Sequence, residues 1–209
     1  MTKLVLDLYK EGDVPQKLAL DLEKAEIFKA ILTWAGETDL DLHALHTVNL
    51  GSGARATSFE DILSTYNVDR VTPSGKRVGI LPLAADKTFS IHGGALVHSP
   101  DAQQGGDEYI IVNPSYLTMP DVGRIEIPLL AMIHEQAQGK VFRDVVNPRV
   151  TILNSRDEKL LEVSLSDQFG SFKGVHLGSI VIEPNMPPAY LNLGAGFNTN
   201  FNGVLADFT

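Results

Sequence analysis

Two groups of carboxylates carry the residue types that a hard cation would need. Asp39 and Asp41 are separated by one leucine at the start of a strand-like segment. Side chains in a strand alternate between its two faces, so these two carboxylates share a face about 7 Å apart. The second group is the glycine-containing loop from Asp101 to Glu108, which also holds Asp107. Calcium takes about six to eight oxygen ligands from flexible loops of this kind. Both groups are therefore candidate calcium ligands, with a solvated strand edge and an ordinary turn as the alternative interpretations.

The histidines give weaker indications of a metal site. His43 and His46 are three residues apart, which in a strand places them on opposite faces and argues against a shared ion. His134-Glu135 resembles half of a zinc-protease motif. That motif needs a second histidine four residues after the first, where this chain has Gln138. We therefore expect His134 and Glu135 to be structural.

Other catalytic signatures are missing from the sequence. There is no cysteine, and hence no thiolate nucleophile and no disulfide. The chain also lacks a Gly-x-Ser-x-Gly motif, a phosphate-binding loop and a glycine fingerprint that leads into a helix. The sequence therefore predicts a protein that is not an enzyme. A hydrolase that uses His134 and Glu135 is the least favoured alternative.

The charge and hydropathy of the chain exclude two classes of partner. The formal net charge is -9 and the pI is about 5.0, whereas nucleic-acid binding needs a basic surface. An acidic surface is compatible with cation binding, and it is also typical of a protein that merely stays soluble. No apolar run approaches the roughly 18 residues of a membrane helix, and the first residues lack the pattern of a signal peptide. We expect a cytoplasmic protein with no nucleic-acid partner and no membrane span.

Short strand-like runs broken by turn residues dominate the sequence. This spacing favours an all-β fold, a β-sandwich of two antiparallel sheets with a few short helices. The two segments with helical signals are Ser58–Tyr66 and Ala137–Val146. The expected strands are two runs of alternating leucines, at Leu4, Leu6 and Leu8 and at Leu18, Leu20 and Leu22, followed by Ile27–Trp34, Leu40–Val48, Gly94–Val97, Tyr109–Val112, Arg124–Leu130, Val150–Leu153, Leu160–Leu165, Ser179–Ile182 and Tyr190–Leu193.

A loop-rich insertion at about 49–87 interrupts the single domain that we expect over residues 1–209. Long loops are usually functional or flexible. The charges of this segment nearly balance, so a second molecule would meet less repulsion there than elsewhere on an acidic surface. We expect a surface excursion that contacts a protein partner or a second copy. The alternative is that its apolar residues fold back over one sheet; these residues are Phe59, Ile62, Leu63, Val78, Ile80 and Leu81.

Taken in order, these segments resemble the TerD family of tellurite-resistance and stress proteins. No single motif is specific, and the resemblance lies in the ordered series, which extends over nearly the whole chain. The segments that carry it are Ile31–Trp34, Asp39–Leu42, Gly94–His98, Asp101–Glu108, Ile133–Glu135, Phe142 with Val145 and Asn147, and Gly194–Phe197.

The resemblance implies a calcium-binding β-sandwich with no established enzymatic activity and a link to tellurite resistance or general stress response. It implies calcium ligands at Asp39, Asp41, Asp101, Asp107 and Glu108. The alternative function is a structural or assembly component of a larger bacterial or phage particle, which uses the same fold with a vestigial metal site.

Three departures from the family pattern bear on the metal site. Ala35 follows Trp34 where the family usually has Asp. The acidic loop is shorter and carries Gln103 and Gln104 in place of acidic residues, and the chain has extra residues between Val48 and Gly94. Because of these departures, we expect one calcium site to be weak or lost.

Overall fold

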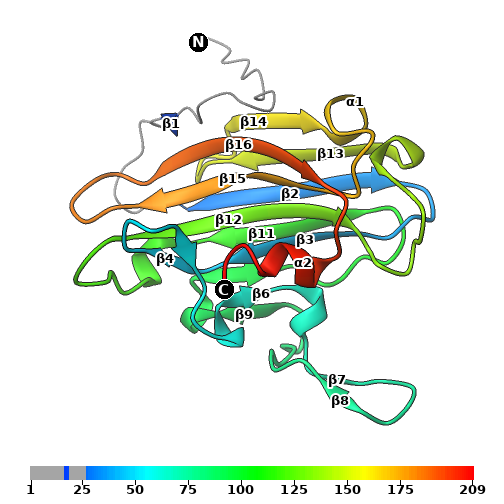
Figure 1. Ribbon diagram of the computed structural model, residues 1–209, viewed down its shortest axis with the longest axis horizontal. Helices are drawn as coiled ribbons and strands as arrows, with labels where there is room; N and C mark the ends of the chain where they lie inside the picture. The colour runs from blue at the N-terminus through cyan, green and yellow to red at the C-terminus, as the bar shows by residue number, and fades with distance from the viewer. Residues whose placement is uncertain (1–16, 19–26) are drawn as a thin grey trace.

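The computed structural model describes residues 17–18 and 27–209, and its elements are almost all antiparallel strands (Figure 1). The expectation of an all-β sandwich is confirmed. The strands are β1 (Lys17–Leu18), β2 (Phe28–Ala35), β3 (Leu40–Leu45), β4 (Thr47–Asn49), β5 (Ala54–Arg55), β6 (Ile62–Leu63), β7 (Arg70–Val71), β8 (Arg77–Val78), β9 (Phe89–Ile91), β10 (Leu96–His98), β11 (Asp107–Val112), β12 (Arg124–Ile133), β13 (Val146–Leu153), β14 (Lys159–Ser164), β15 (Gly174–Ile182) and β16 (Ala189–Phe197). The α-helices are α1 (Leu165–Gln168) and α2 (Phe201–Leu205). The 3₁₀ turns are η1 (Phe59–Asp61), η2 (Thr65–Asn67), η3 (His92–Gly94), η4 (Pro114–Tyr116) and η5 (Phe142–Asp144).

Two sheets form the layers of the sandwich. The larger sheet has the order β1-β16-β15-β12-β3-β6, and β4 and β5 pair beside β12. The smaller sheet has the order β14-β13-β2-β11-β10-β9, and β7 and β8 form a separate hairpin that projects from the body (Figure 1). The short strands β6 and β9 therefore lie at edges of their two sheets.

The main core fills the space between the sheets. In β2, the inward residues are Phe28, Ala30, Leu32 and Trp34, and they alternate with partly exposed neighbours. This alternation is the pattern expected of a strand with one buried face. The other core residues come mostly from β3, β11, β12, β13 and β15.

Strand β3 is buried on both of its faces, which the sequence did not predict. Leu40, Leu42 and Ala44 belong to the main core, whereas Asp41 and His43 lie on the opposite face and are also buried. A second apolar cluster, which includes residues of α2, covers this outer face beside β6 (Figure 1). Two polar side chains of β3 are therefore shielded from water.

Both segments with helical signals fold differently from the prediction. Ser58–Tyr66 forms the turns η1 and η2 on either side of β6, because Ile62 and Leu63 pair with β3 instead of continuing a helix. In Ala137–Val146 only η5 forms, and Gly139 (φ 78°) sits in a left-handed conformation that interrupts any helix. None of the helices in the described ranges is long and apolar enough to cross a membrane. The expected strand residues Leu4, Leu6, Leu8, Leu20 and Leu22 lie outside the described residues.

The insertion 49–87 is partly built into the sandwich. Ile62, Leu63 and Leu81 are buried in the two apolar clusters, as the fold-back interpretation predicts. Phe59 and Ile80 are exposed, at 68% and 49% of their surface. The segment therefore both covers the sandwich and presents apolar side chains to its surroundings.

This division predicts that two substitutions four residues apart change the stability of the protein by very different amounts. Leu63 is completely buried beside Ala44 of β3, so Leu63→Ala should lower the free energy of unfolding by about 2–5 kcal/mol. Phe59→Ala, at an exposed site, should change it by less than about 0.5 kcal/mol. Urea unfolding with unchanged m-values measures both, and equal effects would contradict this assignment of the insertion to the core.

Candidate metal centre

Strand pairing brings carboxylates from distant parts of the chain together. One carboxylate oxygen from each of Asp41, Asp101 and Glu108 lies within 4.8 Å of the other two. Asp41 and Glu108 are completely buried, and Asp101 is exposed. The group therefore has a buried floor and one member open to solvent.

Glu108 ties the acidic loop to strand β3. Its Oε2 accepts a hydrogen bond from the amide of Leu42 at 2.9 Å, and its Oε1 accepts one from the amide of Ala102 at 3.1 Å. His98 is buried next to this carboxylate, with Nε2 3.7 Å from Oε2. The oxygens of Glu108 keep further lone pairs, since a carboxylate can accept about four hydrogen bonds or ligand contacts.

Backbone contacts hold the loop over this group. The amide of Gly105 donates to the carbonyl of Gly36 at 2.8 Å, and the amide of Trp34 donates to the carbonyl of Gly106 at 3.1 Å. A Cβ on Gly105 would lie 2.9 Å from the backbone nitrogen of Gly36. Glycine is therefore required at position 105 for the loop to pack against the end of β2.

Two oxygens of the aspartates have no partner. Thr65 donates to Oδ1 of Asp41 at 2.7 Å. Within the described ranges, Oδ2 of Asp41 and Oδ1 of Asp39 are buried and make no hydrogen bond of normal length, although the hydroxyl of Tyr66 lies close enough to Asp41 to lower its pKa. Buried polar atoms are normally paired, so each unpaired oxygen indicates a missing partner.

The electrostatics of the group are unfavourable while all its members are charged. Burial, with the nearby charge of Asp41, raises the pKa of Asp39 to about 7. Burial, with the charge of Asp101, also raises the pKa of Asp41 to about 7. Burial and the charge of Asp41 raise the pKa of Glu108 to about 9. Either a proton or a cation is needed to offset this charge.

An open polar depression of about 800 Å³ lies over the carboxylates. Asp39 and Asp101 line it, so an ion could reach the group from solvent. Gln103 and Gln104 add amide oxygens at its wall. Two basic residues, Arg70 and Lys140, also line it, and the charge of Arg70 lowers the pKa of Asp41 in part. The depression thus combines acidic and amide oxygen donors.

Asp107 stands apart from this group. It begins β11 on the exposed side of the strand, while its neighbour Glu108 is buried on the other side. Strand alternation therefore separates two side chains that the resemblance places among the calcium ligands. The structure brings together Asp41, Asp101 and Glu108 and leaves Asp107 outside. Asp39 lies close enough for the charge of Asp41 to help raise its pKa.

His134 and Glu135 make contacts that stabilise local structure. The ring of His134 stacks on Tyr66 with centroids 5.0 Å apart, and its Nδ1 accepts a hydrogen bond from the amide of Gln136. The carboxylate of Glu135 accepts a hydrogen bond from the amide of Phe201 at the start of α2. These contacts support the interpretation that His134 and Glu135 are structural.

The sequence analysis missed one further group, in which His46, Asp61 and His92 converge. These residues come from three separated segments with no characteristic spacing, so only the fold brings them together. The argument against a shared ion for His43 and His46 does not extend to this group, since His43 is not a member of it.

The fold and the carboxylate group define a two-sheet β-sandwich with a candidate cation site. Neither a protein-family model nor a curated protein sequence matches this chain. The fold is similar to that of SCO6318 from Streptomyces coelicolor A3(2), described as a homologue of the telluride resistance protein TerD. That similarity has a TM-score of 0.62 at 15% identity and covers 88% of this chain and 96% of the other. It is also similar to SAV2460, a protein of unknown function, with a TM-score of 0.63 at 13% identity over 90% of this chain and 99% of the other. The chain therefore has a TerD-like fold, as the resemblance implied.

The raised pKa of Asp41 predicts a pH dependence of stability in the presence of a calcium chelator. The folded state keeps a proton on Asp41 up to about pH 7, whereas the unfolded state loses it near pH 3.9. Between these values the folded state binds more protons, so this contribution to stability is lost as the pH rises. Asp41→Asn keeps the shape of the side chain and should remove the loss.

Chemical unfolding in chelator at several pH values from 4.5 to 8 measures this effect. The stability of Asp41→Asn relative to the unchanged protein should rise with pH, by about 1.4 kcal/mol for each unit of the pKa shift. Using the difference between the two proteins cancels the contribution of the buried histidines. Parallel pH curves for the two proteins would contradict the charge burial at Asp41.

Proposed function

We propose that this protein is a TerD-like calcium-binding module in which Asp39, Asp41, Asp101 and Glu108 hold the ion. The convergence of three carboxylates within 4.8 Å carries the proposal. The unpartnered oxygens of Asp39 and Asp41 support it, because a cation would supply the missing partner. The module binds and does not catalyse.

Calcium is the cation that suits the chemistry of these donors. All the candidate donors are oxygens, from carboxylates and from the amides of Gln103 and Gln104. Calcium is a hard ion that accepts irregular arrangements of about six to eight oxygens, including water. The open depression leaves room for water to complete the coordination.

The biological setting that we propose follows the similarity in fold. A solved protein of similar fold is described as a homologue of the telluride resistance protein TerD. We propose that this chain likewise acts in tellurite resistance or general stress response, in the cytoplasm. The absence of cysteine is compatible with a reducing compartment.

Calcium should raise the thermal stability of this protein through the carboxylate group. A ligand that binds only the folded state adds about 2.7 kcal/mol at 100 times its Kd, which corresponds to about 5–10 °C in Tm for a domain of this size. Asp41→Asn should lose most of this shift, and Asp107→Asn, the matched control on the exposed side of β11, should keep it.

Thermal melts of the three proteins in millimolar calcium and in chelator measure the prediction. Identical melts of the unchanged protein in both conditions would refute calcium binding. An equal loss in both variants would refute the assignment of the ligands while leaving calcium binding intact.

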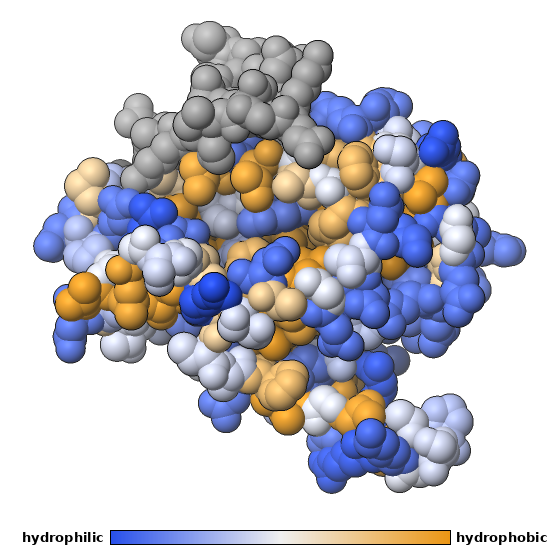
Figure 2. Space-filling view, viewed as in Figure 1, coloured by the Kyte–Doolittle hydropathy of each residue, from blue (hydrophilic) through white to orange (hydrophobic). Residues whose placement is uncertain are grey.

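A role in assembly is the second candidate function, and the insertion supports it. Phe59 and Val71 are 68% and 69% exposed, and Leu83 is 50% exposed. Val71 belongs to the projecting hairpin β7–β8 (Figure 1), whose surface carries both hydrophobic and hydrophilic residues (Figure 2). Because the charges of this segment nearly balance, we propose that it contacts a second copy of the chain.

Self-association predicts a mass in solution that depends on these side chains. At about 100 µM, the Kd of a dimer held by about 5.5 kcal/mol, light scattering should give a mass above that of one chain. The double variant Phe59→Ser, Val71→Ser should return it to that of one chain, because polar side chains replace the exposed apolar contact. A monomeric mass for the unchanged protein at all concentrations would contradict this contact.

A further inference from the structure

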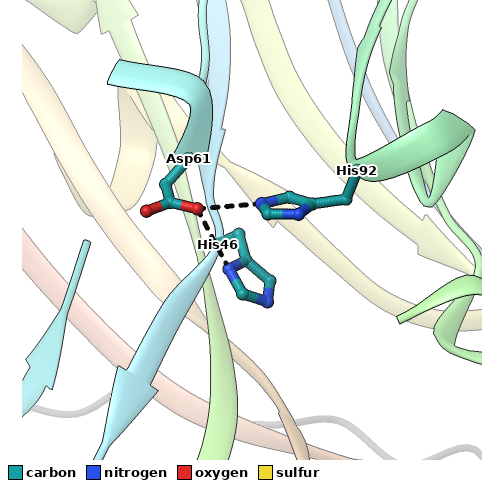
Figure 3. Close-up of side chains that lie close together, drawn as sticks. All are labelled: His46, Asp61 and His92. Atoms are coloured by element: carbon teal, nitrogen blue, oxygen red, sulfur yellow. Dashed lines mark hydrogen bonds and ion pairs between the residues drawn. The ribbon is translucent and has the colours of Figure 1, made fainter. Parts of the chain in front are cut away.

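A second group of side chains lies where the edges of the two sheets meet. Asp61 ends the turn η1 just before β6, and His92 begins the turn η3 just after β9. His46 lies between β3 and β4. The three side chains point toward one another (Figure 3). They are separate from the carboxylate group and play no part in the proposed calcium site.

The two imidazoles approach a single oxygen of Asp61. Nδ1 of His46 lies 3.3 Å from Oδ1, and Nε2 of His92 lies 2.9 Å from the same atom (Figure 3). In a tetrahedral zinc site with bonds of about 2.0–2.1 Å, neighbouring ligand atoms are about 3.3–3.4 Å apart. The two distances to Oδ1 are thus within about 0.5 Å of that spacing, and all three candidate ligand atoms lie within 4.8 Å of one another.

Hydrogen bonds to one oxygen of Asp61 fix the orientation of its carboxylate and leave the other oxygen to face the two imidazoles. Oδ2 accepts from the amide and the hydroxyl of Thr57, both at 2.7 Å, and from the amide of Ser58 at 3.0 Å. These three bonds use the accepting capacity of Oδ2 and leave Oδ1 aimed at the imidazoles. Partners that orient a ligand in this way are characteristic of metal sites.

The backbone also holds the two histidines in place. The amide of His46 donates to the carbonyl of Asp61 at 2.8 Å, directly beside the pairing of β3 with β6. His92 has φ of 50°, in the left-handed region that histidine seldom adopts. The two glycines that follow it, Gly93 and Gly94, also have positive φ and allow the chain to turn here.

The protonation states suit metal binding. Burial, with the nearby His92, lowers the pKa of His46, so its ring is neutral at pH 7 and can offer a lone pair. Burial raises the pKa of Asp61, but the hydrogen bonds from Thr57 and Ser58 lower it more, and the carboxylate is ionised. The side chains of His46 and Asp61 are 13% and 6% exposed, and that of His92 is 31% exposed. A ligand position therefore faces solvent.

We propose that His46, Asp61 and His92 bind a divalent transition metal of the zinc type, with water in the remaining position. Two imidazole nitrogens and one carboxylate oxygen are donors that zinc prefers and calcium does not. The bound ion joins β3, the insertion and β9, and thus closes one edge of the sandwich.

Binding of Zn²⁺ and of Co²⁺ to untagged protein tests the proposal. Isothermal titration with Zn²⁺ at pH 7.5 should give one site per chain, and Co²⁺ should give the strong visible absorption of a four-coordinate ion. His92→Asn removes the imidazole and keeps a residue that tolerates the left-handed backbone. It should weaken Zn²⁺ binding at least about 100-fold, beyond the range for loss of an outer partner.

Two further variants separate a ligand role from a structural one. Thr57→Val removes the hydroxyl that orients Asp61 from an exposed position and should weaken Zn²⁺ binding by about 10-fold. His134→Asn makes the same change as the test variant at a histidine outside this group and should leave Zn²⁺ affinity unchanged. No binding of Zn²⁺ to the unchanged protein, or equal affinity in His92→Asn, would overturn the proposal and leave Asp61 as a hydrogen-bond acceptor for two imidazoles.

Discussion

Burial of negative charge at one end of β3 is the constraint on which the rest of the site depends. Asp41 and Glu108 are completely buried, and in the part of the chain that the structure describes the charge of Arg70 lowers the pKa of Asp41 only in part. In a low-dielectric interior, a charge without a partner costs several kcal/mol, on the order of the whole stability of a domain. The protein can hold these groups only by protonating them or by binding a cation. Because a proton and a cation would compete for the same oxygens, occupancy of the proposed metal site would depend on pH and on folding.

The same burial follows from the way the larger sheet is covered. A sandwich strand normally has one face in the core and one in water, and its outward side chains titrate freely. In β3 the outward face is covered by α2 and by residues of the insertion, such as Ile62. The cover raises the pKa of Asp41 and keeps His43 in its neutral form, since burial holds the pKa of His43 far below its ordinary value. Elements that appear peripheral therefore set the chemistry of the site.

The sequence predicted the sheets better than it predicted the site. Period-two alternation, as in Phe28 to Trp34, depends only on one buried face and is visible locally. The helical signal of Ser58–Tyr66 failed because Ile62 and Leu63 pair with a strand that is distant along the chain, and such pairing overrides local propensity. Carboxylates close to each other along the chain were predicted to act together, whereas alternation separates Asp107 from Glu108. His46, Asp61 and His92 had no local signal, because three different loops supply them.

The shortness of β6 affects how copies of this protein can meet. An edge strand with free amides and carbonyls can recruit a strand from another chain, and long edges of this type lead to fibres. Strand β6 contains only Ile62 and Leu63, and the turns η1 and η2 bend the chain away at both ends. An incoming strand would find too few backbone partners there to extend the larger sheet. This edge is therefore a poor template for strand-by-strand growth of the sheet from copy to copy, and a contact between copies here would depend on side chains.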